Sequence, residues 1–267
     1  MRTRKLLIGA SFSIVLLLIA LAAQLLCPHD PNAQIFSPLQ SPSLEHPAGT
    51  DRFGRDMFSR ILVALQTSLL SSLILVLIIT SLGCLIGFIC AYKGGIIDNL
   101  LMRISDICLA FPGLVFALAI AALLQGGLQN AILALALVSW PKYARIARSQ
   151  SLAILSSDYI AAAKLAGGSS HHIVAQHILP NTLGPILVTA TLDIGTMMME
   201  LAALSFLGLG ASPPTAELGQ MMSAGRSMLQ SYPWLIIGPG IAMFIAVACF
   251  NVMGDALRDY LDPRALH

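Results

Sequence analysis

Charged residues are scarce in this chain of 267 residues. Asp, Glu, Lys and Arg together make up 10%, whereas typical soluble domains have about 25%, and 57% of the residues are hydrophobic. The mean hydropathy is +0.81. A soluble fold of this length would have too little polar surface to cover itself. The composition therefore excludes an ordinary soluble protein and predicts a membrane protein.

Several chemical patterns are also missing. The five cysteines show no CxxC spacing, so they are expected to be small buried side chains rather than a disulfide or zinc framework. The net charge of +2 is too small to suggest a nucleic-acid partner. Ser, His and Asp occur without a G-x-S-x-G context. We therefore expect no catalytic residue, no fixed metal site and no bound nucleic acid.

A phosphate-binding loop is absent as well. Such a loop reads GxxxxGK[ST], and the chain contains no Gly-Lys dipeptide. The chain therefore cannot bind ATP in that way, and if its function is driven by ATP, a separate ATPase must bind it.

Six apolar runs are long enough to cross a bilayer, which requires roughly 20 residues in a helix. They predict an all-α, polytopic membrane protein with six transmembrane helices. The first run follows Arg2, Arg4 and Lys5 and could be a signal peptide, but its length and the lack of a cleavage site favour an uncleaved anchor. The predicted spans are 6–26, 69–91, 104–124, 130–147, 186–207 and 234–253.

The distribution of Lys and Arg predicts the orientation. If the N-terminus is cytoplasmic, the outer face holds only Arg52, Arg55, Arg60 and Arg226, and the other basic residues lie inside. Both termini are then cytoplasmic, with residues 1–5 inside and 27–68 outside. The charged stretch GTDRFGRDMFSR, residues 49–60, belongs to this outer loop. It is either a structured segment or a solvated loop whose charges keep it out of the lipid.

A long cytoplasmic segment, 150–185, is predicted between the fourth and fifth spans. Ser157 or Asp158 can cap a short helix, Gly167 and Gly168 can end it, and Pro180 is expected to end a second helix. Two short helices at an angle suit docking into a groove of another protein.

This segment resembles a known motif. The stretch YIAAAKLAGGSSHHIVAQHILPN is similar to the coupling segment of ATP-binding-cassette (ABC) importer permeases, with Ala161 at the position of the usual glutamate. GTDRFGRDMFSRILVALQTSL, LAFPGLV, SFLGLGASPPTAELGQMM and FNVMGDALRDYLDP resemble the second permease of the oligopeptide, dipeptide and nickel family, and the nickel permease most of all. The resemblance assigns ATPase coupling to Ala161, Ala162, Ala163, Gly167, Ile178, Leu179 and Pro180.

The resemblance implies a type I ABC importer transmembrane domain over residues 69–267, located in the bacterial inner membrane. The implied partners are a second permease, two ATPases that carry ATP and Mg²⁺, and an external binding protein; this chain itself binds no cofactor. The expected cargo is nickel or a nickel chelate, with di- or oligopeptides as the alternative. A different class, an ATP-independent channel or ion-coupled carrier, stays open. The resemblance also favours an outer gate segment braced by Asp51, Arg52, Arg55 and Asp56.

Two carboxylates fall inside the fifth predicted span. Asp193 and Glu200 are seven residues apart, so they share one helix face with Met197. Carboxylates at membrane depth are costly and usually face protein or water. They are therefore candidates for lining the transport pathway, and the alternative is a structural role. The loop histidines His29 and His46 could touch a metal-carrying binding protein, but loop histidines are usually only exposed, and no role is assigned to them.

Overall fold

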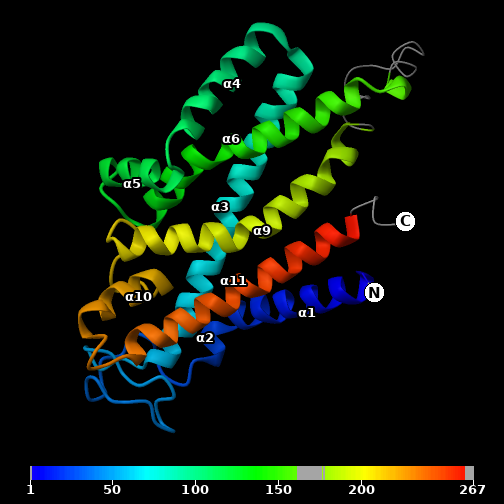
Figure 1. Ribbon diagram of the computed structural model, residues 1–267. Helices are drawn as coiled ribbons and strands as arrows, with labels where there is room; N and C mark the ends of the chain where they lie inside the picture. Colours follow the sequence, from blue (N-terminus) through cyan, green and yellow to red (C-terminus); the bar gives the residue numbers. More distant parts are fainter. Residues whose placement is uncertain (1, 161–175, 177, 262–267) are drawn as a thin grey trace.

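The computed structural model describes residues 2–160, 176 and 178–261, and within these ranges the chain is built from helices (Figure 1). An isolated bridge pairs Thr50 with Asp56. The elements, in chain order, are α1 (Arg2–Leu21), α2 (Ala23–Leu26), α3 (Met57–Lys93), α4 (Gly95–Ala110), α5 (Gly113–Leu123), α6 (Leu128–Leu155), α9 (Leu179–Phe206), α10 (Leu218–Gly225), the short 3₁₀ helix η2 (Arg226–Met228) and α11 (Trp234–Leu261).

The described part of the chain has four helices that are long and apolar enough to cross a membrane: Thr3–Leu21 within α1, α3, α9 and α11. The pair α4 and α5 raises the number to five if it counts as one broken span. The predicted number of six is therefore not confirmed. The fourth predicted span lies in α6, which is long enough but carries Lys142, Arg145 and Arg148 in its second half.

The third predicted span, 104–124, is not one continuous helix. α4 and α5 meet at an angle of 94°. Phe111, at the junction, has an extended backbone with φ −100° and ψ 150°. The next residue is Pro112, and a residue that precedes proline is disfavoured in the helical conformation. The proline that the sequence places inside the apolar run thus divides it.

Other helices begin or end at residues that differ from the predicted bounds. α3 begins at Met57, because Asp56 caps it, so residues 57–68 are helical rather than part of a loop. Pro180 occupies the first turn of α9, where its missing N–H costs nothing, and most of the second short helix predicted before it lies outside the described residues. α11 begins at Trp234 as predicted and continues to Leu261.

The helices α3 and α6 pack closely through glycines. A Cβ added at Gly83 would lie 2.5 Å from the carbonyl oxygen of Trp140, and one at Gly87 would lie 2.4 Å from that of Ala144. Both distances are far below normal contact. Small residues at these positions let the two backbones approach, as is common between membrane helices.

The start of α1 and the end of α11 lie side by side at one end of the bundle (Figure 1). Ser13 Oγ of α1 donates a hydrogen bond of 3.3 Å to the carbonyl of Cys249 in α11. Lys5 and Asp259 form an exposed ion pair of 3.5 Å. The start of α1 and the end of α11 are thus on the same side of the bundle. That this side faces the cytoplasm stays a prediction.

Candidate translocation cavity, outer segment and coupling region

A cavity of about 200 Å³ lies between the α4–α5 junction, α6 and α9. It brings together all three residues predicted to line a pathway, and it collects side chains from four helices around the sharp bend at Phe111. The lining residues are Cys108, Leu109, Phe111, Gly113, Val138, Ser139, Lys142, Asp193, Thr196, Met197 and Glu200.

Asp193 is buried and its charge is compensated. Lys142 Nζ, on α6, donates to both carboxylate oxygens at 2.7 and 2.9 Å. The hydroxyl of Tyr143 donates to Oδ2 at 2.8 Å. A buried carboxylate held by a cation and a hydroxyl avoids the cost of an unpaired charge. Asp193 therefore fixes α9 against α6 and is not a free ligand for a passing cation.

Glu200 differs from Asp193, although it lies on the same wall. It is half-buried, and within the described ranges its carboxylate forms no hydrogen bond or ion pair, although the charge of Lys142 acts on it. The three neighbouring methionines divide by position: Met197 lines the cavity, Met198 is fully buried in the core, and Met199 is 49% exposed. One methionine of the run and one unpaired carboxylate thus face the cavity.

The charged segment of residues 49–60, predicted to lie outside, is organised around Asp51. Its Oδ1 accepts hydrogen bonds from the backbone N–H groups of Phe53 (2.8 Å) and Arg55 (3.0 Å). Its Oδ2 accepts from Arg55 Nε and forms an ion pair with the same guanidinium, both at 2.6 Å. Gly54, at the tip of this turn, has φ +71°, and a Cβ there would lie 2.1 Å from the carbonyl of Phe36. Only glycine fits this position.

The four residues predicted for the gate segment do not form one cluster. Asp56 belongs to a different contact, because it caps α3 through Ser59 and pairs with His46. Arg52 is exposed and stacks on the ring of Phe53, with Cζ 4.7 Å from the ring centroid. Asp51 and Arg55 alone pair with each other.

Two buried polar residues, Glu217 and Ser68, form a contact that the sequence did not predict. Glu217 is 1% exposed and caps α10 by accepting from the N–H groups of Gly219 and Gln220. Ser68 Oγ, on α3, donates to Glu217 at 2.9 Å and accepts from the N–H of Leu218. These bonds join α10 to α3. Glutamate is not among the usual capping residues, so no local signal marked Glu217.

The coupling region is described only at its two edges. Ala161, Ala162, Ala163 and Gly167 lie outside the described residues. The remaining three predicted residues differ in burial: Ile178 is 2% exposed, while Leu179 and Pro180 are exposed. Ile178 packs with the buried Ile160, and this pair contacts Phe88, Ile154 and Leu155 at the ends of α3 and α6. The segment is therefore anchored to the bundle at both edges.

Long apolar helices with a cavity between them that carries Lys142, Asp193 and Glu200 are typical of a membrane transport protein. The chain belongs to the family described as the binding-protein-dependent transport system inner membrane component, whose model matches residues 83–267. This confirms the predicted family and fold class. The chain is thus a permease subunit of an ABC importer and not an enzyme.

Curated relatives cover most of the chain. It is 43% identical to the probable D,D-dipeptide transport system permease DdpC of Escherichia coli, over 96% of this chain and 87% of the relative. It is 46% identical to the dipeptide permease DppC of Alkalihalophilus pseudofirmus, over 85% and 74%. It is 40% identical to the nickel permease NikC of Escherichia coli, over 93% and 90%. These identities do not single out the nickel permease.

The fold also matches a solved transporter. The MetNI methionine ABC transporter, in inward-facing conformations, aligns with a TM-score of 0.56 at 21% identity, covering 74% of this chain and 96% of the matched chain. At this identity the likeness concerns the fold alone.

Proposed function

We propose that this chain forms half of the translocation pathway for a short peptide or peptide-like zwitterion, delivered by an external binding protein. The observation that carries the proposal is the charge pattern of the cavity along α9. Lys142 is half-exposed and shares its cation with Asp193, while the carboxylate of Glu200 makes no ion pair in the described part of the chain. A solute with an amine at one end and a carboxylate at the other complements such a wall. Weak contacts with both ends would let it enter and leave.

Nickel is the second candidate. A cation site built on both carboxylates is disfavoured, because Asp193 already accepts from Lys142 and Tyr143. Glu200 and Met197 remain available on the cavity wall, and a carboxylate with one thioether could offer weak contacts to a metal ion or its chelate. The similarity to a nickel permease supports this alternative, just as the similarity to dipeptide permeases supports a peptide cargo.

Uptake measurements separate the two cargoes. A strain lacking the genes for this transporter is complemented with the whole set, and uptake of a labelled dipeptide is compared with uptake of radioactive nickel. We expect dipeptide uptake to be restored and nickel uptake to stay at background. Restoration of nickel uptake alone would overturn the first proposal and favour the second.

The energy source is part of the proposal. We infer that a second permease and two ATPases assemble with this chain, that ATP and Mg²⁺ bind to the ATPases, and that segment 150–185 docks to one of them. The anchoring of Ile160 and Ile178 on the bundle supports this role, since a docked segment needs a rigid base to transmit force. An ATPase variant without hydrolysis should abolish uptake. Uptake that persists would indicate an ATP-independent carrier.

The orientation follows from the same proposal, in which both termini and the coupling segment lie in the cytoplasm of a bacterial inner membrane. A cysteine placed at Gly167, in a background without the five native cysteines, tests it. A membrane-impermeant thiol reagent should label this site in inverted vesicles and not in intact cells. A cysteine at Arg52, which is exposed in the outer segment, is the matched control and should show the opposite pattern.

A further inference from the structure

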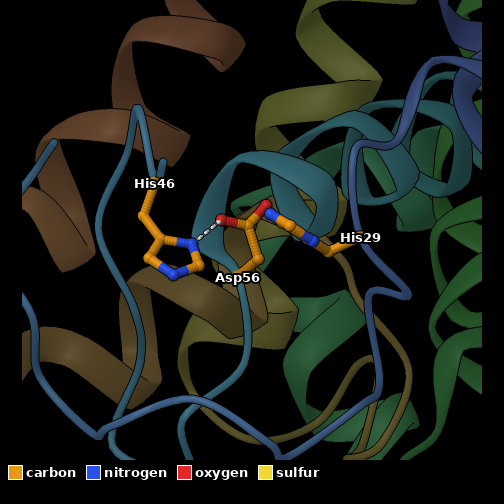
Figure 2. A group of neighbouring side chains, drawn as sticks. All are labelled: His29, His46 and Asp56. Carbon is orange, nitrogen blue, oxygen red and sulfur yellow. Dashed lines mark hydrogen bonds and ion pairs between the residues drawn. The ribbon is translucent and has the colours of Figure 1, made fainter. Parts of the chain in front are cut away.

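Three side chains with metal-ligating atoms meet beside the N-terminus of α3 (Figure 2). His29 follows α2, His46 comes from the loop before the charged turn, and Asp56 is the cap of α3. One ligand atom from each lies within 4.8 Å of the others. Figure 2 shows the carboxylate of Asp56 between the two imidazoles. Residues far apart in the sequence thus present two nitrogens and one oxygen to a common point.

The distance between His46 and Asp56 already suits a shared ion. His46 Nδ1 and Asp56 Oδ1 are 3.0 Å apart. Nitrogen and oxygen ligands lie about 2.0–2.2 Å from a transition metal, so two neighbouring ligands of one ion are roughly 3 Å apart. His46 is 2% exposed and Asp56 is fully buried, so this edge of the site is fixed. His29 is half-buried and has room to move the remaining distance.

The surroundings orient these groups as a metal site requires. Ser59 donates to Asp56 Oδ2 from both its N–H (2.8 Å) and its Oγ (2.7 Å), which leaves Oδ1 directed at His46. The same Oγ accepts a hydrogen bond of 3.2 Å from the backbone N–H of His29. One residue therefore positions two of the three ligands, as outer-shell partners do in known metal sites.

An approach to the cluster is also present. A cavity of about 430 Å³ is lined by His29 together with Cys27 and Asp30. The Cys27 thiol donates to the backbone carbonyls of Ala23 (3.1 Å) and Ser59 (3.4 Å) and does not belong to the cluster of ligand atoms. The ligand set is then two imidazoles and one carboxylate.

We propose that His29, His46 and Asp56 form a binding site for a divalent transition-metal ion such as Zn²⁺ or Ni²⁺, which fastens residues 27–46 to the start of α3. Two imidazoles and a carboxylate suit these ions, and water would complete the coordination. The site is separate from the cavity along α9 and does not depend on the cargo that the transporter carries.

Metal binding to the purified complex tests the site. The complete transporter, with affinity tags removed, is stripped with a chelator and titrated with Co²⁺ as a spectroscopic probe. We expect wild type to bind one more Co²⁺ per copy of this chain than His29→Phe, with a d–d absorption band that the variant lacks. Phenylalanine keeps the ring contacts of His29 with Phe36 and His46. We also expect Zn²⁺ to raise the Tm of wild type and not of the variant.

A second variant keeps the test decisive if His29→Phe does not assemble. Asp56→Asn preserves a good helix cap and removes the charge, so its Co²⁺ affinity should fall by about tenfold or more, as for loss of one metal-site partner. Asp30→Asn, in the same cavity but outside the ligand set, is the matched control and should bind as wild type. Equal Co²⁺ binding and equal spectra for wild type and Asp56→Asn would overturn the proposal and leave an ordinary hydrogen-bonded pair.

Discussion

The charged segment of residues 49–60 and the cavity along α9 differ in how far their charged side chains are buried and paired. In residues 49–60 every charged side chain except Arg52 is buried and paired within the protein. In the cavity Asp193 and Lys142 are paired with each other, and the Glu200 carboxylate forms no ion pair with any described residue. Paired and buried charges fix a geometry, whereas an unpaired charge remains available to a ligand. Residues 49–60 therefore form a rigid brace at one end of α3, and the cavity wall on α9 keeps a carboxylate that can bind a ligand.

The largest expected effect comes from breaking the brace. Asp51→Ala removes the acceptor for two backbone N–H groups and strands the buried guanidinium of Arg55. Breaking a buried pair in this way costs about 3–5 kcal/mol. The free energy of unfolding in detergent should fall by that amount. The control is Arg52→Ala, whose side chain is exposed, and it should change stability by less than about 0.5 kcal/mol. Equal effects for both variants would refute the idea of a rigid brace.

A smaller effect is expected from the paired part of the cavity. In a double-mutant cycle of Lys142→Met and Asp193→Asn, each single change leaves one partner without its ion pair, so the two effects should not add. Lys142 is half-exposed, which weakens the pair relative to a fully buried one. We expect a coupling energy of about 0.5–2 kcal/mol in unfolding measurements. Strict additivity would show that the contact carries no energy.

The unpaired carboxylate should affect transport more than stability. Glu200→Gln leaves no buried partner behind, so the free energy of unfolding should change by less than about 0.5 kcal/mol. The KM for dipeptide uptake should rise by about tenfold, which corresponds to the loss of roughly 1.4 kcal/mol of binding. Met199→Leu, on the same helix but outside the cavity, is the matched control. An unchanged KM in Glu200→Gln would place the cargo elsewhere.

The smallest effect is expected where the two chain ends meet. Lys5 and Asp259 form an ion pair at 3.5 Å, and both side chains are more than half exposed. Exposed pairs contribute about 0–1 kcal/mol and are screened by salt. Lys5→Ala should therefore lower the unfolding free energy by less than about 0.5 kcal/mol, and 0.5 M NaCl should remove the difference. A larger loss that is insensitive to salt would contradict this description.

The sequence predicts the membrane class, the family and most spans, because these depend on long apolar runs and on motifs that are local in the chain. It does not predict the break at Pro112 as a sharp bend, since a proline can also kink a continuous helix. α3 starts at Met57 because Asp56 caps it. This cap is hard to recognise in the sequence, because Asp56 is one of several charged residues in the stretch 49–60.

The polar contacts were harder to predict than the helices. Asp193 looked available for a cation until the structure brought Lys142, 51 positions away, to its side. Glu217 and Ser68 are 149 positions apart, and His29 and His46 looked like exposed loop residues. Each of these contacts depends on how distant segments pack, and no spacing in the sequence encodes it.

The native Cys108 gives the most direct test of the claim that cargo passes along α9, because it lines the cavity opposite Asp193 and Glu200. The complete transporter is prepared with Cys108 as its only cysteine in this chain, and the rate of its reaction with a small thiol reagent is measured with and without a transported dipeptide. We expect dipeptide to slow the labelling about fivefold or more, and Glu200→Gln to reduce this protection. A labelling rate that no transported solute changes would show that cargo does not pass along α9.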